Sequence, residues 1–216
     1  MKSKNRSKIL SKPSLDSGKV VIISGPSGSG KSTICRHLRK HPLVWMSISA
    51  TTRPKRPREV NGQDYYFLDQ KTFEKWIQEN KFVEYAKVID HYYGTPLVPV
   101  EEKVSEGKIV LLDIDIQGHE IIKEKGVLEQ KGIPSISIFI LPPSMEELEK
   151  RLRDRKTEKE EEIQKRLQRA RKEMEKASQY DFQVLNDDVN RATQKVCDII
   201  GLSYEELVRL EEGFIQ

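Results

Sequence analysis

Short runs of aliphatic and β-branched residues alternate with amphipathic segments along most of the 216-residue chain. The apolar runs typical of buried parallel strands lie at 19–24, 43–49, 108–115, 135–141 and 181–186. Helical patterns lie at about 30–39, 100–106, 187–200 and 203–212. Because right-handed crossovers join such alternating elements, the pattern predicts an α/β protein with a parallel sheet flanked by helices.

The pattern changes between 49 and 96, where short aromatic strands surround a single helix. The strands are expected at 65–68, 81–88 and 92–95, and Phe73, Trp76 and Ile77 share one face of the helix. Strands this short pair locally, as hairpins do. Residues 49–96 are therefore predicted to form a small mixed α+β subdomain inserted into the core.

Two strongly charged helices are expected at about 144–155 and 158–178. Their apolar positions form a narrow stripe, made by Met145, Leu148 and Leu152 on the first helix and by Ile163, Leu167, Ala170 and Met174 on the second. A narrow stripe indicates helices that pack only lightly, so residues 142–165 are interpreted as a mobile helical lid. The segments 18–48, which carries the glycine-rich loop, 97–141 and 166–216 are expected to form the core.

Residues 1–17 are rich in lysine and serine and have almost no apolar side chains. This composition predicts a disordered basic tail. We interpret it as a solubilising tail, with binding of nucleic acid or of a partner as the alternative.

The composition limits the function classes. Hydrophobic residues make up 36% of the chain, and 38 bases against 34 acids give a net charge of +4, which does not indicate a nucleic-acid partner. Cys35 and Cys197 are expected to be buried free thiols in a reducing compartment, and the four histidines lack metal-ligand spacing. No apolar run reaches the ~18–20 residues that span a bilayer, and no secretory signal precedes the core. We therefore expect a cytoplasmic protein without a membrane partner.

A glycine-rich loop, GPSGSGKST at 25–33, fits the pattern G-x-x-x-x-G-K-[ST] between a strand and a helix. Gly28 and Gly30 let backbone N–H groups turn toward phosphates, and the helix N-terminus adds its positive end. Lys31 is expected to reach the β- and γ-phosphates of a nucleotide, and Ser32 to bind Mg²⁺. The predicted ATP-binding residues of the loop are Gly25, Pro26, Ser27, Gly28, Ser29, Gly30, Lys31, Ser32 and Thr33.

Two acids, Asp113 and Asp115, stand at the end of the apolar run LLDID. Ligands of parallel α/β sheets bind outside the carboxyl ends of the strands. Asp113 is therefore predicted to hold Mg²⁺, directly or through water. The alternative is that both are turn acids at a strand end.

A second anion site is suggested by the loop TTRPKRPREVNGQDYY at 51–66. Arg53 and Arg56 lie three positions apart, and Tyr65 and Tyr93 each offer a phenolic hydroxyl. Guanidinium groups and hydroxyls together can surround one phosphate. A solvated basic loop would be the alternative, but an inserted subdomain beside a phosphate loop is what a nucleoside monophosphate acceptor requires.

Several motifs together resemble the guanylate kinase family from about Lys19 to Leu210. The segment SATTRPKRPREVNGQDYYF matches that family's signature around the acceptor loop. The segments FVEYAKV, YYGT, LLDIDIQG, RLRDRKTE, IQKRL and VLNDDVNRA follow in the family's order. This combination is far more specific than the glycine-rich loop alone.

The resemblance implies that GMP is the acceptor of a phosphoryl group from ATP, with Mg²⁺ as the cofactor. The implied contacts to the base come from Ser49, Glu84, Thr95 and Asp115, and those to the GMP phosphate from Arg53, Arg56, Tyr65 and Tyr93. Arg151, Arg155 and Arg166 match catalytic lid arginines that act with Lys31, and Asn186 matches a position near the donor adenine. Glu84 suits its position because a carboxylate accepts from both the N1 proton and the 2-amino group of guanine.

The chain departs from the family pattern at a few places. Arg58, Ala50 and Lys156 replace residues that are usually Gly, Ser and Gly, and VIDHYYGT lacks the usual Gly-Asn. These changes affect loop conformation and remove no group with an assigned chemical role.

Two other functions are considered beside this kinase activity. One is a non-catalytic module similar to the guanylate-kinase-like domains of membrane-associated scaffold proteins. The other is a kinase of a different small phosphorylated acceptor. The intact Lys31, Ser32 and Asp113 argue against the first, and Glu84 with its neighbouring hydroxyls against the second. The expected state is a monomer or a homodimer.

Overall fold

The structure is a computed structural model, and it describes residues 18–88, 90–154 and 160–213. The tail predicted at 1–17 lies outside these ranges, as do Arg155 and Lys156. All elements below are given within them.

The centre of the molecule is a five-stranded sheet with the order β2-β7-β1-β8-β9, in which every neighbouring pair is parallel. Its strands are β1 (Lys19–Ser24), β2 (Val44–Met46), β7 (Ile109–Asp113), β8 (Ser135–Leu141) and β9 (Phe182–Leu185). The predicted fold class is confirmed. The strands are apolar at most of their positions because helices cover both faces of the sheet.

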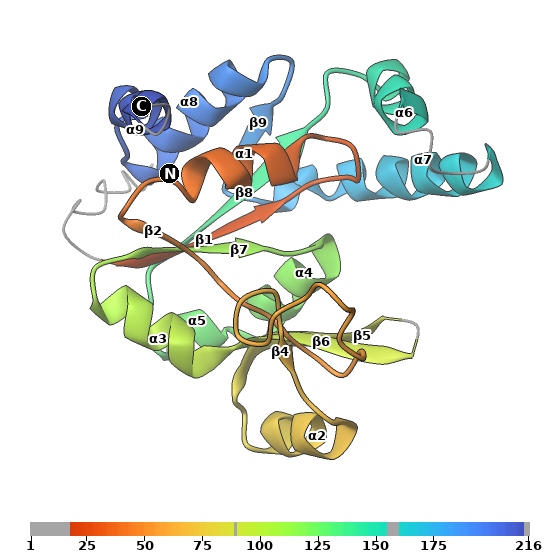
Figure 1. Cartoon of the computed structure of the whole chain (residues 1–216). Helices are drawn as coiled ribbons and strands as arrows, with labels where there is room; N and C mark the ends of the chain where they lie inside the picture. The colour runs from red at the N-terminus through yellow and green to blue at the C-terminus, as the bar shows by residue number, and fades with distance from the viewer. Residues whose placement is uncertain (1–17, 89, 155–159, 214–216) are drawn as a thin grey trace, which may run out of the picture.

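Helices cover both faces of this sheet (Figure 1). Alternate residues of β1 point into two separate cores on these two faces. Val21 and Ile23 contribute to the core formed with α1 (Lys31–Leu38), α8 (Val189–Ile200) and α9 (Tyr204–Glu212). Val20 and Ile22 contribute to the core formed with α3 (Leu97–Ser105), α4 (Ile116–Lys125) and α5 (Val127–Gln130). Cys35 and Cys197 are buried free thiols, as predicted.

A second, smaller sheet has the order β4-β3-β6-β5 and mixes parallel and antiparallel pairs. Its strands are β3 (Ala50–Thr51), β4 (Tyr66–Phe67), β5 (Phe82–Val88) and β6 (His91–Pro96), with helix α2 (Gln70–Gln78) packed against them. Phe73 of α2 stacks on Phe82 and Tyr92, with ring centroids 4.5 and 5.3 Å away. This aromatic cluster forms a core that is separate from those of the large sheet.

Helices α6 (Met145–Asp154) and α7 (Glu160–Glu175) lie beside each other at one end of the large sheet (Figure 1). Most of the narrow apolar stripe is buried within the pair, since Leu148, Leu152, Ile163 and Leu167 are all at least 95% buried. Packing within this pair is therefore tight and not light, because the two narrow stripes face each other. The mobility of the pair stays a prediction.

Two strands of the large sheet end earlier than the sequence predicts. The strand expected over 43–49 ends at Met46, and the one expected over 108–115 ends at Asp113, because Asp115 caps α4. Helices α4 and α5 were not expected at all. Helix α4 is difficult to detect because Gly118 and His119, both buried, lie in its first turn and have low helix propensity. Among the described residues, no helix is long and apolar enough to span a membrane.

Candidate functional site

The glycine-rich loop connects β1 to α1 and needs glycine at particular positions. Gly28 and Gly30 adopt φ angles of 95° and 89°, which are unfavourable for other residues. A Cβ atom at Gly30 would lie 2.0 Å from Nδ2 of Asn186, and one at Gly28 would lie 2.9 Å from Cδ1 of Leu148. The loop is therefore enclosed by side chains from β9–α8 and from α6.

Asn186, which is 4% exposed, is hydrogen-bonded to the backbone of the loop. Its Nδ2 donates to the carbonyl oxygen of Ser29 at 2.6 Å, and its own backbone N–H donates to Leu141 at 2.8 Å. A cavity of about 310 Å³ opens at this point. It is lined by Gly28, Gly30, Thr33, Arg151, Asn186 and Val189.

Lys31 and Asp113 meet at the start of α1. The Lys31 ammonium donates to Oδ1 of Asp113 and, at 3.4 Å, to the carbonyl oxygen of Ile114. Ser32 follows in the first turn of α1, and its side chain is exposed. The described residues hold no group of three or more His, Cys, Asp or Glu side chains that could bind a metal. The Ser32 hydroxyl and the Asp113 carboxylate are oxygen donors of the kind that Mg²⁺ prefers, with water and phosphate completing its shell.

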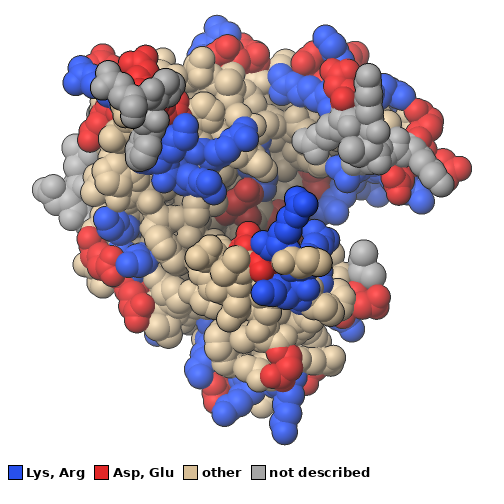
Figure 2. All heavy atoms as spheres, viewed as in Figure 1, with Lys and Arg blue, Asp and Glu red and all other residues tan. Residues whose placement is uncertain are grey.

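A larger cavity, of about 480 Å³, lies between the loop and helix α7. It is lined by Gly25, Pro26, Ser27, Gly28, Gly30, Lys31, Ser32, Thr33, Asp115, Arg166, Arg169 and Glu173. Arg166 reaches the loop directly, since its Nη1 donates to Oγ of Ser27 at 3.0 Å. In Figure 2 the molecule is hollowed on the side of α7, and Lys and Arg side chains lie on both edges of the hollow.

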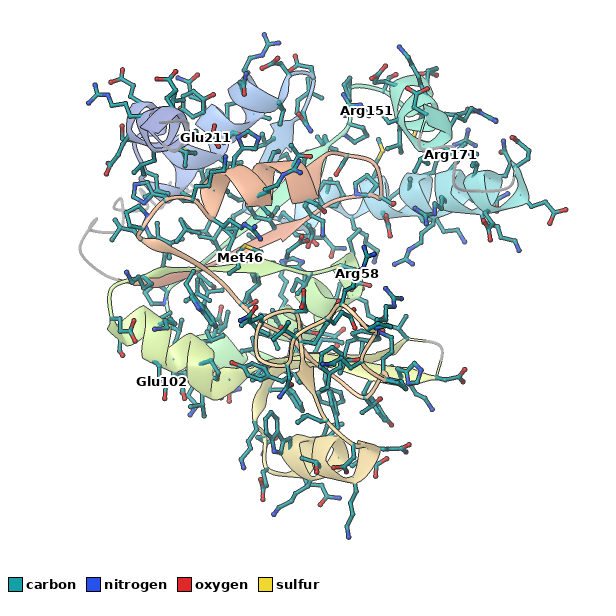
Figure 3. The ribbon with its side chains drawn as sticks, in the orientation of Figure 1. Met46, Arg58, Glu102, Arg151, Arg171 and Glu211 are labelled. Atoms are coloured by element: carbon teal, nitrogen blue, oxygen red, sulfur yellow. The ribbon has the colours of Figure 1, made fainter. Side chains whose placement is uncertain are left out.

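The described lid arginines occupy different places. Arg151 donates from Nη2 to the carbonyl oxygen of Asn186 at 3.3 Å and pairs with Glu147 at 3.1 Å (Figure 3). It therefore belongs to the smaller cavity, whereas Arg166 belongs to the larger one. Arg166 contacts the loop itself, whereas Arg151 contacts Asn186, which is hydrogen-bonded to the loop.

The acceptor loop is organised around Arg53 and Glu59. Arg53 pairs with Oε1 of Glu59 at 2.6 Å, and Oε2 of Glu59 accepts from the Arg56 backbone N–H at 2.8 Å. The Arg53 guanidinium lowers the pKa of Glu59 below its ordinary value. One carboxylate therefore holds the backbone of one arginine and the side chain of another, while the Arg56 side chain stays exposed.

Two tyrosines complete this cluster. Tyr65 and Tyr93 meet edge to face with ring centroids 6.0 Å apart, and Arg53 lies 5.5 Å from the centre of the Tyr65 ring. Hydrogen bonds to Glu59 and then to Tyr93 raise the pKa of Arg53. Arg58, on the same loop, lies on the side that faces the hollow (Figure 3).

Glu84 is a buried carboxylate in the small sheet. It lies opposite Thr95 in the β5–β6 pair, and the Thr95 hydroxyl donates to its Oε1 at 2.6 Å. Burial raises the pKa of Glu84, and the nearby charge of Asp115 acts in the same direction. Tyr93 and Thr95 are two residues apart on β6, so they share one face of the sheet with Glu84.

Asp115 lies between the two halves of the site. Its Oδ1 accepts from the Gly118 N–H at 3.0 Å as the N-cap of α4, and its Oδ2 lies 3.5 Å from Nη2 of Arg169. Ser49 directly precedes β3 and is half-buried. Its carbonyl oxygen accepts a hydrogen bond from the Tyr66 backbone N–H at 2.9 Å.

Three residues of the site had no predicted role. Glu59 carried a signal in the acceptor signature, and Arg169 and Glu173 follow Arg166 at helical spacings of three and seven. These spacings place Arg166, Arg169 and Glu173 on one face of α7.

A parallel sheet with a phosphate loop at the carboxyl end of its first strand defines a P-loop nucleotide-binding protein. The family model described as guanylate kinase matches residues 17–202. The chain belongs to the guanylate kinase family.

Individual relatives agree with this result. The chain is 43% identical over 201 residues to a guanylate kinase of Clostridium tetani, with 93% of this chain and 94% of the relative covered. It is 49% identical over 185 residues to a guanylate kinase of Caldanaerobacter subterraneus, covering 85% and 86% of the two chains. Its fold is similar to the crystal structure of guanylate kinase from Anaplasma phagocytophilum, with a TM-score of 0.62, 31% identity and 86% of each chain covered.

Proposed function

We propose that the chain transfers the γ-phosphoryl group of ATP to GMP, which gives ADP and GDP. One observation carries the choice of acceptor: a buried carboxylate, Glu84, lies beside the Thr95 hydroxyl on the same small sheet as an arginine–tyrosine cluster. A carboxylate here accepts from the N1 proton and the 2-amino group of guanine. The cluster binds the phosphate of the same nucleotide.

The donor occupies the glycine-rich loop. Backbone N–H groups of residues 25–33 and the N-terminus of α1 bind its phosphates, and Lys31 exchanges part of its contact with Asp113 for the β- and γ-phosphates. Ser32 and Asp113 would hold Mg²⁺, which would neutralise charge on the phosphates when it is bound with ATP. Asn186 lies near the donor base.

The acceptor occupies the small subdomain over residues 49–96. Arg53, Arg56, Tyr65 and Tyr93 bind the GMP phosphate, and Ser49, Glu84, Thr95 and Asp115 contact the base. Glu59 orients Arg53 through its 2.6 Å ion pair. The GMP phosphate is already a nucleophile at neutral pH, so no general base is required.

Arginines on the lid complete the site, with Arg166 on α7 and Arg151 on α6. We propose that closure of the segment at 142–165 moves Arg151 and Arg155 onto the transferring phosphoryl group, beside Arg166, which already contacts Ser27 of the loop. Their charges are then most useful in the transition state, where negative charge spreads over the equatorial oxygens. Closure also excludes water, which would otherwise accept the phosphoryl group. Cytoplasmic location and a monomeric or dimeric state stay predictions.

A coupled assay of ADP formation tests the proposal with GMP, AMP, UMP and CMP as acceptors. Turnover with GMP and little with the other three is the expected result. Equal turnover with AMP would contradict the assigned role of Glu84. ADP formation without any acceptor dependence would contradict phosphotransfer itself.

A further inference from the structure

One face of helix α7 is turned toward the cavity above the phosphate loop. Arg166, Arg169 and Glu173 all line this cavity, and their spacings of three and seven residues place them in a row along the helix. Arg166 contacts the loop through Ser27. Arg169 lies one turn further along and does not share that partner.

Arg169 has a carboxylate on each side. Its Nε donates to Oε1 of Glu173 at 2.7 Å, and its Nη2 lies 3.5 Å from Oδ2 of Asp115. Glu173 is on the same helix, so it can only orient the guanidinium. Asp115 belongs to α4, on the far side of the cavity, so the second contact joins two elements.

Asp115 is well placed for such a contact because its two oxygens have separate partners. Oδ1 caps α4 by accepting from the Gly118 N–H at 3.0 Å, which leaves Oδ2 facing Arg169. The charge of Asp115 also raises the pKa of Glu84, so this carboxylate lies close to the acceptor side of the site. The Arg169–Asp115 contact therefore connects α7 with the acceptor side.

We propose that Arg169 is a positioning residue that ties α7 to α4 through Asp115 and so holds Arg166 over the phosphate loop. The inference rests on the proposed function, but Arg169 does not touch the reacting atoms. The Arg169 side chain is 68% exposed, so the contact is of the weak, solvent-screened kind. Its effect is correspondingly moderate.

Amide hydrogen exchange of α7 in the protein without nucleotides tests the tether directly. In Arg169→Ala, exchange within 160–175 should accelerate by about 2- to 5-fold, the range that an exposed ion pair supports. Arg171→Ala is the matched control, because residue 171 lies two positions on, on the other side of the helix, and does not line the cavity. Equal acceleration in both variants, or in neither, would overturn the inference.

A double-variant comparison identifies Asp115 as the partner. Asp115→Asn removes the charge, while asparagine still caps a helix well. We expect Asp115→Asn to accelerate α7 exchange as much as Arg169→Ala does, and the double variant to exchange no faster than either. If the acceleration in the double variant equalled the product of those in the two single variants, Arg169 would act through a group other than Asp115, and the proposal would be overturned.

The kinetic consequence separates this inference from the proposed function. With GMP as acceptor, kcat/KM of Arg169→Ala should fall by about 2- to 5-fold, and Arg169→Lys should recover part of the loss because it keeps the charge. Arg171→Ala should match the wild-type protein. If the wild-type protein failed to phosphorylate GMP, the proposed function would fall. Wild-type kinetics in Arg169→Ala would remove only the role of Arg169.

Discussion

At the scale of single residues, the proposed preference for guanine depends on Glu84. Glu84 is 6% exposed, and its Oε1 accepts a hydrogen bond from the Thr95 hydroxyl at 2.6 Å. AMP has no proton at N1 and no 2-amino group. A desolvated carboxylate would face adenine unpaired, and sites of this kind reject such analogues by about 10⁴–10⁵.

Glu84→Gln keeps the shape of the side chain but cannot accept from two nitrogens with both terminal atoms. With GMP, kcat/KM should fall by about 10- to 100-fold, the size expected for a lost hydrogen bond to a charged group. Steady-state kinetics with GMP and AMP measure this loss. Glu102→Gln, an exposed change on α3, is the matched control. Unchanged GMP kinetics in Glu84→Gln would mean that Glu84 does not bind the base.

Glu84→Gln should lower activity with GMP but raise the stability of the fold at neutral pH. A carboxyl whose pKa is raised by burial stabilises the fold below its unfolded pKa of about 4.5, and that contribution is lost as pH rises through the raised pKa. Above its raised pKa, the ionised form of buried Glu84 therefore costs stability. Thermal unfolding without nucleotides should give Glu84→Gln a higher Tm than wild type at pH 7, with the difference shrinking toward pH 4.5. A lower Tm at pH 7 would show that the surroundings favour the ionised form.

Arg166 is the second residue with a specific kinetic signature. Because its charge is most useful in the closed transition state, Arg166→Ala should lower kcat by about 10²-fold or more, with little change in the KM for GMP. Arg171→Ala, on the same helix, supplies the control for loss of charge. Normal kcat in Arg166→Ala would remove this residue from the catalytic set.

At the scale of elements, α6 and α7 form a small core of their own and also contact the loop. Leu148 and Leu152 are fully buried, and they lie 2.9 and 3.3 Å from where a Cβ at Gly28 would be. Helix α6 therefore packs on the glycine-rich loop, and α7 reaches the same loop through Arg166. Their stability and the position of the loop are coupled.

Leu152→Ala should loosen α6 and α7 more than the rest of the molecule. Loss of a fully buried leucine costs about 2–5 kcal/mol, so amide exchange in these helices should accelerate by at least about 30-fold. Exchange in β1 and β8 should change little. Leu207→Ala, in the core under α9, is the comparison and should affect the large sheet instead. Uniform acceleration in Leu152→Ala would mean that the helices unfold only with the whole chain.

At the scale of the whole molecule, the donor loop and the acceptor cluster belong to different sheets. Lys31 and Asp113 lie at the large sheet, whereas Arg53 and Glu84 lie at the small one. Each sheet has its own hydrophobic core. The two nucleotides should therefore bind with substantial independence.

Lys31→Ala should nearly abolish transfer and leave GMP binding close to wild type, because the proposed function places Lys31 on the donor alone. Arg53→Ala is the reciprocal variant and should weaken GMP binding by about 10- to 100-fold with little change for ATP. Titration calorimetry with each nucleotide measures both effects. Loss of GMP binding in Lys31→Ala as complete as its loss of activity would contradict the division into two sites.

Local features of the sequence determined much of this picture. The apolar runs that became β1, β7, β8 and β9 were predicted because burial on both faces requires uninterrupted apolar residues. The glycines of residues 25–33 were informative because φ angles near 90° are a local requirement. The acceptor loop was identified from its fixed spacing of charged and aromatic residues. All of these signals act over a few positions of the chain.

Only the tertiary structure decided which distant groups meet. Asn186 holds the carbonyl of Ser29 across 157 positions, and Arg166 reaches Ser27 across 139. Helix α4 was missed because its burial depends on neighbours from other elements, and Asp115 serves as its cap as well as facing the cavity. No periodicity contains such information, because these contacts follow from how helices and sheets pack and not from the preferences of neighbouring residues.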